Sequence, residues 1–166
     1  DYKIVHLAGH GEFNKNQPEN SGMVIGEHSF LTTADIENMS TVPELVFVNC
    51  CHLGRTDHKA EEFYRTAYRL AANIGTQLIK NGVKAVVVAG WAVNDQAALR
   101  FTDVFYQSMF DGDCFGDAVR KARKVIFDEY QDVANTWGAY QCYGDPFYRF
   151  YREQDSREKG EYEFVI

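Results

Sequence analysis

Two short segments of the chain carry the residue types that covalent catalysis requires. His10 and Gly11 end the run HLAGHG, and Cys51 comes directly after an apolar run that closes with Cys50. A histidine and a cysteine at the ends of two neighbouring parallel strands would meet in space, although about forty residues separate them in the sequence. Because an imidazole beside a thiol can generate a nucleophile, the pattern predicts a cysteine-dependent acyl-transfer enzyme, and a protease before other types.

The predicted role of each residue follows from its place relative to the strand ends. Cys50 closes an apolar strand and is expected to pack in the core, whereas Cys51 is expected to begin a loop and to point into a crevice as the nucleophile. Burial of Cys51 as a small apolar residue is an equally good interpretation. His10 lies between two glycines where the strand is expected to have ended, so it is the candidate base. The amides of Gly11 and Cys51 could hold an oxyanion.

A zinc site is the competing interpretation of the same region. Its candidate ligands are His6, His10, Cys51, His52 and His58. Their spacing matches no common zinc pattern and the chain holds no HExxH motif, so we expect neither a metal nor another cofactor. His6, inside the predicted strand, is expected to be a core or supporting residue.

Polar residues after the third apolar run complete the predicted crevice. Asp95 could pair with a basic side chain of a substrate, or Asn94 and Asp95 could cap the helix that is expected to start at Gln96. Trp91 could form an apolar wall for a bound peptide, or it could belong to the core. Because all three strands would end at one edge of a sheet, this convergence is more informative than any single motif.

Length, composition and charge predict one ordinary globular domain. The 166 residues suffice for a core without disulfides or metal, and 45% of them are hydrophobic. The net charge of −7 without a basic stripe argues against nucleic-acid binding. The cysteines include no CxxC pair, and the adjacent Cys50 and Cys51 would point to opposite faces of a strand, which favours a reduced cytoplasmic protein.

The two ends of the chain and its most apolar stretch carry further expectations. No stretch is apolar over the roughly 20 residues that a membrane span needs, and no secretory signal opens the chain. A membrane is therefore not an expected partner. The start at Asp1, without an initiator methionine, is expected of a piece of a longer polypeptide. Residues 1–152 are expected to form the domain, and the charged residues 153–166 a solvated tail or tether.

Hydrophobic patterning predicts an α/β fold. Apolar runs over residues 4–8, 45–50 and 83–89 are typical of strands covered on both faces. Apolar spacings of three and four predict helices over residues 61–81, 96–110 and 115–130, with Leu99 among the inward positions. The remaining expected elements are a helix over residues 34–39 capped by Thr32 or Thr33, a hairpin of residues 23–25 and 28–31, and a last strand over residues 138–143. This order implies a parallel sheet between two helical layers.

Five sequence blocks resemble the CHAT domain, a caspase-like cysteine peptidase module of clan CD that is related to separase and caspases. The first two are the histidine–glycine block HLAGHG and the apolar strand that ends in NCCHLG, which looks like the family's Ser-Ala-Cys-Glu-Thr-Gly type of sequence. The others are GWAVND followed by Phe105 and Tyr106, GDAVRKA, and Trp137 with the later GDP. They occur in the family's order over nearly the whole chain.

The resemblance implies a caspase-like three-layer α/β/α sandwich with a mostly parallel sheet, and a cysteine endopeptidase activity. It implies His10 as general base, Cys51 as nucleophile, and the Gly11 and Cys51 amides as the oxyanion hole. Asp95 falls where related peptidases place acidic residues of the pocket for the side chain before the cut, which implies a preference for arginine or lysine. It further implies a protein substrate, an upstream regulatory or repeat domain, and a role in bacterial immunity or regulated cell death.

Departures from the family pattern leave alternatives open. His52 replaces the usual acidic residue after the nucleophile, and Cys50 replaces a small residue, so Cys50 is a rival nucleophile. The family has one or two strands before the histidine block, and their absence here would leave an unpaired sheet edge and a fragment without activity of its own. The alternative functions are a catalytically inactive interaction module and a thioesterase or amidase on the same dyad.

Overall fold

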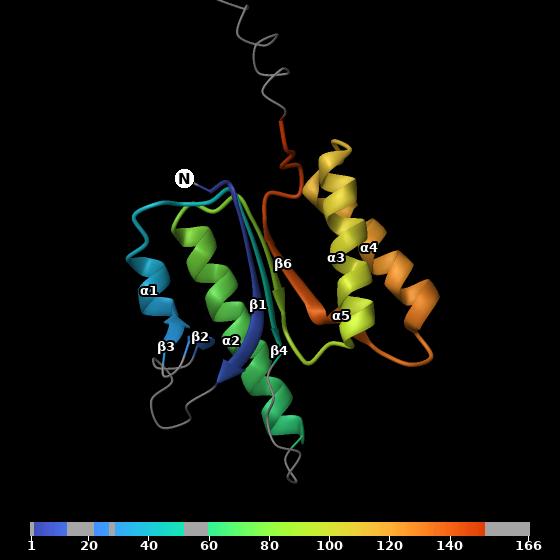
Figure 1. The fold of residues 1–166 in the computed structure, drawn as a ribbon, viewed down its shortest axis with the longest axis horizontal. Helices are drawn as coiled ribbons and strands as arrows, with labels where there is room; N and C mark the ends of the chain where they lie inside the picture. Colours follow the sequence, from blue (N-terminus) through green and yellow to red (C-terminus); the bar gives the residue numbers. More distant parts are fainter. Residues whose placement is uncertain (1, 13–21, 27–28, 52–59, 152–166) are drawn as a thin grey trace, which may run out of the picture.

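The computed structural model describes residues 2–12, 22–26, 29–51 and 60–151, without the side chains of residues 12, 33, 50, 51, 60–67 and 70. The described residues form a six-stranded sheet with five helices (Figure 1). The strand order is β3-β2-β1-β4-β5-β6. In chain order the elements are β1 (Ile4–Glu12), β2 (Gly22–Gly26), β3 (Ser29–Thr32), α1 (Thr33–Glu37), β4 (Leu45–Cys51), α2 (Ala60–Lys80), β5 (Ala85–Ala89), α3 (Asp95–Phe110), α4 (Phe115–Tyr130), α5 (Thr136–Ala139) and β6 (Tyr140–Gly144).

The three central strands are parallel, as the apolar runs predict. β4 lies between β1 and β5 and pairs in parallel with both. β5 is buried over its whole length, which explains its continuous apolar sequence. Two predicted strand ends were wrong, because β1 continues through His10 to Glu12 and β4 includes Cys51. The extension of β1 follows from its pairing with β2, in which Glu12 lies opposite Gly22.

Antiparallel strands flank this centre and make the sheet mixed. β2 and β3 form the predicted hairpin, which joins the carboxyl end of β1. β6 pairs with β5 and forms the other edge of the sheet. The last strand was predicted too early, since residues 136–139 are helical. Thr136 is buried there and accepts a hydrogen bond from the backbone N–H of Asn94, which holds this turn against the sheet.

Local signals explain where the helices begin and end. Thr32 caps α1, because its hydroxyl accepts a hydrogen bond from the N–H of Asp35 and the Asp35 carboxylate accepts one from the N–H of Thr32. Asn94 caps α3 by accepting a hydrogen bond from the N–H of Ala97. Gly82, with a φ of 100°, ends the turn after α2.

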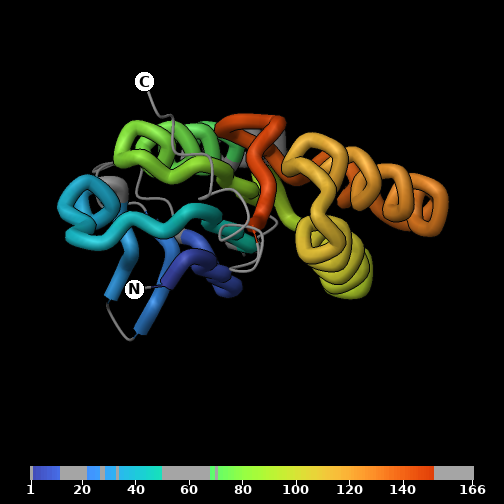
Figure 2. Tube along the Cα trace, turned by 90° about the horizontal axis from the view of Figure 1, so that it is seen from above, coloured from blue at the N-terminus to red at the C-terminus, as the bar shows by residue number. Residues whose placement is uncertain are grey.

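The helices cover both faces of the sheet and enclose two cores. α3 and α4 pack on the face that carries Leu45, Phe47 and Val87. α1 and α2 pack on the opposite face, over Val46 and Val48. In Figure 2 the pair α3 and α4 lies on the side of the sheet away from α1. The expected three-layer sandwich is therefore confirmed, and neighbouring residues of β4 face different helical layers.

One predicted core position on α3 was wrong. Leu99 is 73% exposed, whereas Phe101, Phe105 and Met109 are fully buried. The buried positions of α3 recur every four residues from Ala97 onward. Leu99 lies about half a turn away from this stripe and so faces solvent.

The described residues bear on two expectations, which concern membrane-spanning segments and disulfides. None of the described helices is both long enough and apolar enough to cross a lipid bilayer. Cys114 and Cys142, the cysteines whose side chains are described, are free thiols. Burial raises the pKa of Cys142 to about 11, which keeps this thiol protonated and unreactive.

Candidate active site

The carboxyl ends of the parallel strands meet at one edge of the molecule. β1 and β4 end there, and the segment after β5 leads there into α3 (Figure 1). The N–H of Gly90 donates a hydrogen bond of 2.8 Å to the carbonyl of Ala139, which ties α5 to the same edge. Ligands of open α/β sheets bind beyond the carboxyl ends of the strands. We call this side of the sheet, where β1, β4 and β5 end, the carboxyl edge, and the opposite side, where they start, the amino edge. The carboxyl edge is the candidate site.

His10 and Cys51 are direct neighbours in adjacent parallel strands. The register of β1 with β4 pairs their Cα atoms and, one step earlier, those of Gly9 and Cys50. Neighbouring strands lie about 4.8 Å apart, so the backbone brings the two predicted catalytic residues together. The His10 side chain is exposed. The side chains of both cysteines lie outside the description, so Cys51 as the nucleophile remains a prediction.

The contacts of His6 show which face of β1 carries His10. The His6 ring stacks on Phe47 with a centroid distance of 4.7 Å and an interplanar angle of 11°. Its Nδ1 lies 3.2 Å from the hydroxyl oxygen of Tyr106 on α3. Alternate residues of a strand share a face, so His10 also lies on the α3 face. His6 is thus a supporting residue, as predicted, and it fixes β1 against α3.

Burial shifts the pKa values of both His6 and Tyr106. The partly covered position of His6 lowers its pKa below the ordinary value. Burial raises the pKa of Tyr106 to about 12. Both side chains are therefore neutral at pH 7, so the contact between His6 and Tyr106 is not an ion pair.

The backbone of Gly11 faces the end of β4. The carbonyl of Lys3 accepts a hydrogen bond of 3.1 Å from the N–H of Leu45, so the odd-numbered residues of β1 turn their backbone groups toward β4. The N–H of Gly11 therefore points toward Cys51. The same N–H can continue the β1–β4 ladder, and service in an oxyanion hole requires it to be free. The oxyanion roles of Gly11 and Cys51 stay predictions.

Asp95 presents a carboxylate at this edge without capping the helix. It is the first residue of α3 and is exposed. The cap is Asn94, whose Oδ1 lies 3.0 Å from the N–H of Ala97. A carboxylate in the first turn also interacts favourably with the helix dipole. Of the two interpretations, capping belongs to Asn94, and substrate binding by Asp95 is still a prediction.

Trp91 is half-buried and firmly held next to α5. Its Nε1 donates a hydrogen bond of 3.2 Å to Oδ1 of Asn135. Its ring lies over Gly138, where a Cβ would come within 3.5 Å of a ring carbon. Trp91 is absent from both described core clusters. It therefore packs at the periphery of the site, and its use as a wall for a peptide remains predicted.

Sequence reasoning missed Asn49, the most unusual polar residue of the site. Asn49 pairs with Ala8 and precedes Cys51 by two positions, on the same face of β4 as Phe47. Its Oδ1 is buried and accepts no hydrogen bond from the described residues. Such an orphan acceptor costs about 1–3 kcal/mol. The available signal was a carboxamide inside an otherwise apolar run.

Comparison with models of known protein families identifies the family of this chain. A model of the CHAT domain matches residues 1–145. The chain belongs to the CHAT domain family. CHAT domains are caspase-like and related to clan CD, and the α/β sandwich described above is compatible with that fold. No curated protein matches the sequence.

Three of the five CHAT sequence blocks lie at the carboxyl edge. The histidine–glycine block ends in the last part of β1, and the first three residues of NCCHLG end β4. GWAVND leads from the end of β5 to the first residue of α3. The remaining residues of NCCHLG, His52–Gly54, lie outside the described residues. GDAVRKA, by contrast, forms part of α4, where Ala118 and Ala122 are fully buried and serve packing.

The zinc alternative concerns side chains that are only partly described. Among the described side chains of this CHAT domain, no three histidine, cysteine, aspartate or glutamate residues are grouped so that they could hold a metal ion. His52, His58 and the thiol of Cys51 lie outside that description. His6 is engaged by Phe47 and Tyr106.

Proposed function

We propose that this CHAT domain is a cysteine endopeptidase that uses His10 and Cys51 to cleave a protein substrate. His10 takes the proton of the Cys51 thiol, and the thiolate attacks the carbonyl carbon of the peptide bond. The amides of Gly11 and Cys51 hold the oxyanion of the tetrahedral intermediate. His10 then gives the proton to the leaving amine, and water hydrolyses the thioester with His10 as base.

The register between β1 and β4 is the observation that carries the proposal. It pairs the backbones of His10 and Cys51 at the edge where α/β sheets bind their ligands. The exposure of His10 leaves its imidazole accessible to a substrate. Membership of a caspase-like family agrees with a peptidase-related role for this edge.

Two oxygen acceptors favour a basic side chain before the scissile bond. Asn49, two residues before Cys51, holds a buried Oδ1 that has no donor among the described residues. Asp95 exposes a carboxylate at the same edge. Arginine or lysine would supply hydrogen-bond donors to the first oxygen and a positive charge to the second. The net charge of −7 adds a long-range attraction for basic substrates.

We further propose that the domain is the effector part of a larger, regulated cytoplasmic protein. The free thiols of Cys114 and Cys142 suit a reducing compartment, as does a thiolate mechanism. The resemblance to CHAT domains supports an upstream regulatory or repeat domain as partner and a role in immunity or cell death.

Labelling by a substrate-like electrophile tests the mechanism. A fluorescent peptidyl acyloxymethyl ketone with arginine beside the reactive group should label the wild-type chain and Cys50→Ala equally. Cys51→Ala should lose the label, since only Cys51 is paired with His10. A matched ketone with leucine in place of arginine should react at least about tenfold more slowly, which corresponds to the loss of one good charge-assisted contact.

The other outcomes identify the rival functions. Label that persists in Cys51→Ala and disappears in Cys50→Ala would make Cys50 the nucleophile and overturn the assignment. Absence of label from all three proteins would favour the inactive interaction module. Labelled protein that creates no new protein termini in a digested proteome, yet hydrolyses a thioester, would favour the thioesterase or amidase.

A further inference from the structure

The order of the strands at the carboxyl edge gives a bound peptide a direction. β1, β4 and β5 lie side by side, with His10 near the end of β1, Cys51 at the end of β4 and Asp95 after β5. In the proposed mechanism His10 gives its proton to the leaving amine, so the half of the peptide after the cut lies toward β1. The acyl half, which stays on Cys51, therefore extends toward β5 and β6. This inference rests on the proposed function, which assigns these roles.

The helix α5 continues the carboxyl edge beyond β5. The N–H of Gly90 donates to the carbonyl of Ala139 at 2.8 Å, and the N–H of Asn94 donates to the hydroxyl oxygen of Thr136 at 3.0 Å. α5 also packs against α3 and α4, and Figure 1 shows it beside the first turn of α3. Because these contacts fix α5 to the segment after β5, the acyl half of a bound peptide extends toward α5.

Both tryptophans of the chain lie at this junction. Trp137 belongs to α5, and its ring stands edge-on to the ring of Phe127 in α4, with a centroid distance of 5.4 Å and an interplanar angle of 89°. Trp91 packs its ring over Gly138, the residue that follows Trp137. The Nε1–H of Trp91 is already bound to Asn135, so this indole offers a ligand only apolar surface. The junction is thus an aromatic extension of the carboxyl edge.

The aromatic pair of Phe127 and Trp137 is exposed although it is held in a fixed geometry. Phe127 is 42% exposed and Trp137 is 40% exposed. Large aromatic side chains gain free energy when their remaining surface is covered, and their faces and edges favour another ring or a large aliphatic group. The pair can therefore bind an apolar side chain without first ordering its own rings.

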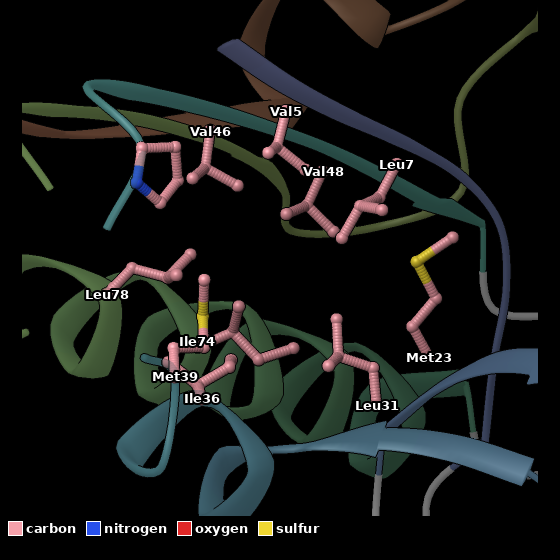
Figure 3. A pocket seen from close by; sticks show the side chains of 11 residues that line it. Val5, Leu7, Met23, Leu31, Ile36, Met39, Val46, Val48, Ile74 and Leu78 are labelled. Atoms are coloured by element: carbon pink, nitrogen blue, oxygen red, sulfur yellow. The ribbon is translucent and has the colours of Figure 1, made fainter. Parts of the chain in front are cut away.

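The aromatic pair is separate from the apolar cavity of the molecule and from its amino-terminal side. Figure 2 shows α4 at the far end of the molecule from the N-terminus and α1. A cavity of about 230 Å³ lies on the α1–α2 face of the sheet, where Val46 and Val48 are part of its lining (Figure 3). His10, by contrast, lies on the α3 face. A peptide held at His10 therefore does not lie over this cavity.

We propose that Phe127 and Trp137 form an apolar subsite of the peptidase, which receives one large apolar side chain on the amino-terminal side of the cut. α5 leads directly into β6, which lies two strands from β4. Two strand spacings amount to about 10 Å, which an extended peptide covers in about three residues. The substrate is thus a protein segment in which a large apolar residue precedes the basic residue by two or three positions.

A series of arginyl acyloxymethyl ketones tests the subsite. One probe carries three alanines before the arginine, and in three others phenylalanine replaces one alanine at a time. Phenylalanine at the second or third position before the arginine should raise the rate of Cys51 labelling at least about tenfold. Equal rates for all four probes, or a gain only at the first position, would overturn the subsite and leave the peptidase intact. Absence of labelling by every probe would instead overturn the proposed function.

Matched variants locate the gain, which is the ratio of the two labelling rates within one variant. Trp137→Ala and Phe127→Ala should each remove most of it. Phe110→Ala is the control and should keep the full gain, because Phe110 is 54% exposed but ends α3 at the amino edge. If Trp137→Ala fails to fold in a thermal melt, Phe127→Ala still gives the result, since it alters an exposed helix position. A gain that survives in a folded variant of the pair, or that Phe110→Ala also removes, would overturn the subsite.

Tryptophan fluorescence tests the direction of the peptide without catalysis, since both tryptophans lie at the junction. Cys51→Ala is mixed with either of two peptides that contain one arginine and one phenylalanine among alanines. Phenylalanine three residues before the arginine should protect the indoles from quenching by acrylamide, whereas phenylalanine three residues after it should not. Equal protection by both peptides, protection by the second alone, or protection by neither would overturn the proposal.

Discussion

The two edges of the parallel sheet differ in how completely their polar groups are paired. At the amino edge, Glu44 accepts hydrogen bonds of 2.9 Å from both Lys84 and Tyr148, and its other oxygen lies 3.6 Å from the ammonium of Lys3. One carboxylate thus links the starts of β1, β4 and β5 to the segment after β6. At the carboxyl edge, Asn49 leaves a buried oxygen without a donor among the described residues.

Backbone hydrogen bonds show the same difference between the amino edge and the carboxyl edge. At the amino edge, the carbonyl of Lys3 accepts from Glu44 at 2.8 Å, that of Glu44 from Lys84 at 3.0 Å, and that of Lys84 from Asp145 at 3.1 Å. These bonds join the starts of β1, β4 and β5 and the end of β6 in series. At the carboxyl edge, His10 and Asp95 are exposed.

This difference separates stability from chemistry within one sheet. Parallel strands place all their starts at one edge and all their ends at the other, so a single topology can close one edge and leave the other available to a ligand. Substitutions at the amino edge should therefore change the free energy of unfolding. Substitutions at the carboxyl edge should change reactivity first.

The largest expected effect is on reactivity, at the carboxyl edge. His10→Ala should lower the rate of Cys51 labelling by the arginine ketone by 10²–10⁴-fold, the usual range for loss of a general base. The melting temperature should change little, because the His10 side chain is exposed. Mass spectrometry of the labelled peptide and a thermal melt measure the two quantities. A labelling rate within threefold of wild type would remove His10 from the mechanism.

A loss of stability without loss of reactivity is expected from Gly144→Ala at the amino edge. Gly144 has a φ of 113°, and a Cβ would overlap the carbonyl of Lys84. Left-handed strain and the clash should together cost about 2–3 kcal/mol of unfolding free energy. Gly112→Ala is the matched control, because φ is 92° there and no atom lies within 4 Å of the added Cβ. It should cost about 1 kcal/mol, from strain alone.

Equal costs for the two glycine variants in a urea titration would show that the crowding at Lys84 relaxes freely. The amino edge would then be less rigid than its hydrogen bonds suggest. Labelling rates measured on the folded fraction should match wild type in both variants, since neither glycine lies at the carboxyl edge.

The sequence predicts those features that depend on local periodicity. α4 begins and ends at the predicted residues, and the three apolar runs form the parallel strands, because buried stripes and runs are visible in any short window. The continuation of β1 to Glu12 was missed, since it depends on pairing with a hairpin. The error at Leu99 came from counting an apolar residue that lies off the stripe.

Side-chain contacts between residues far apart in the chain were beyond prediction, unlike the pairing of neighbouring strand ends. Glu44, Lys84 and Tyr148 meet only after the sheet has formed, and no local pattern connects them. The approach of His10 to Cys51 could be predicted because parallel topology fixes which strand ends are neighbours. Asn49 could have been noticed as a polar residue in an apolar run, but only the structure shows that its Oδ1 has no donor among the described residues.

Asn49→Leu should raise stability and lower selectivity. The Gly144 variant, by contrast, should lower stability and leave reactivity unchanged. Leucine has a similar shape and no orphan oxygen, so the unfolding free energy should rise by about 1 kcal/mol. The preference for the arginine ketone over the leucine ketone should fall, because the buried acceptor is gone. Asn49→Asp serves as the control, since it retains an acceptor and should keep the preference. A variant that is less stable and equally selective would show that Asn49 is a packing residue.

The smallest expected effect is the pH dependence contributed by Glu44. The hydrogen bond from Lys84 is the main cause that holds the pKa of Glu44 below its ordinary value. The folded state therefore binds the proton less strongly than the unfolded state, so the stabilisation is present above the unfolded pKa and is lost as the pH falls through the folded pKa.

Glu44→Gln should consequently show a smaller loss of stability than wild type on acidification from pH 6 to about pH 3. The difference should stay below about 1 kcal/mol, because the Lys84 side chain is 55% exposed and water screens the pair. Lys84→Gln should reproduce most of the effect and Lys3→Gln little of it, since Lys3 is 81% exposed and more distant. Parallel stability curves for wild type and Glu44→Gln would mean that Tyr148 and the backbone bonds, rather than charge, close the amino edge.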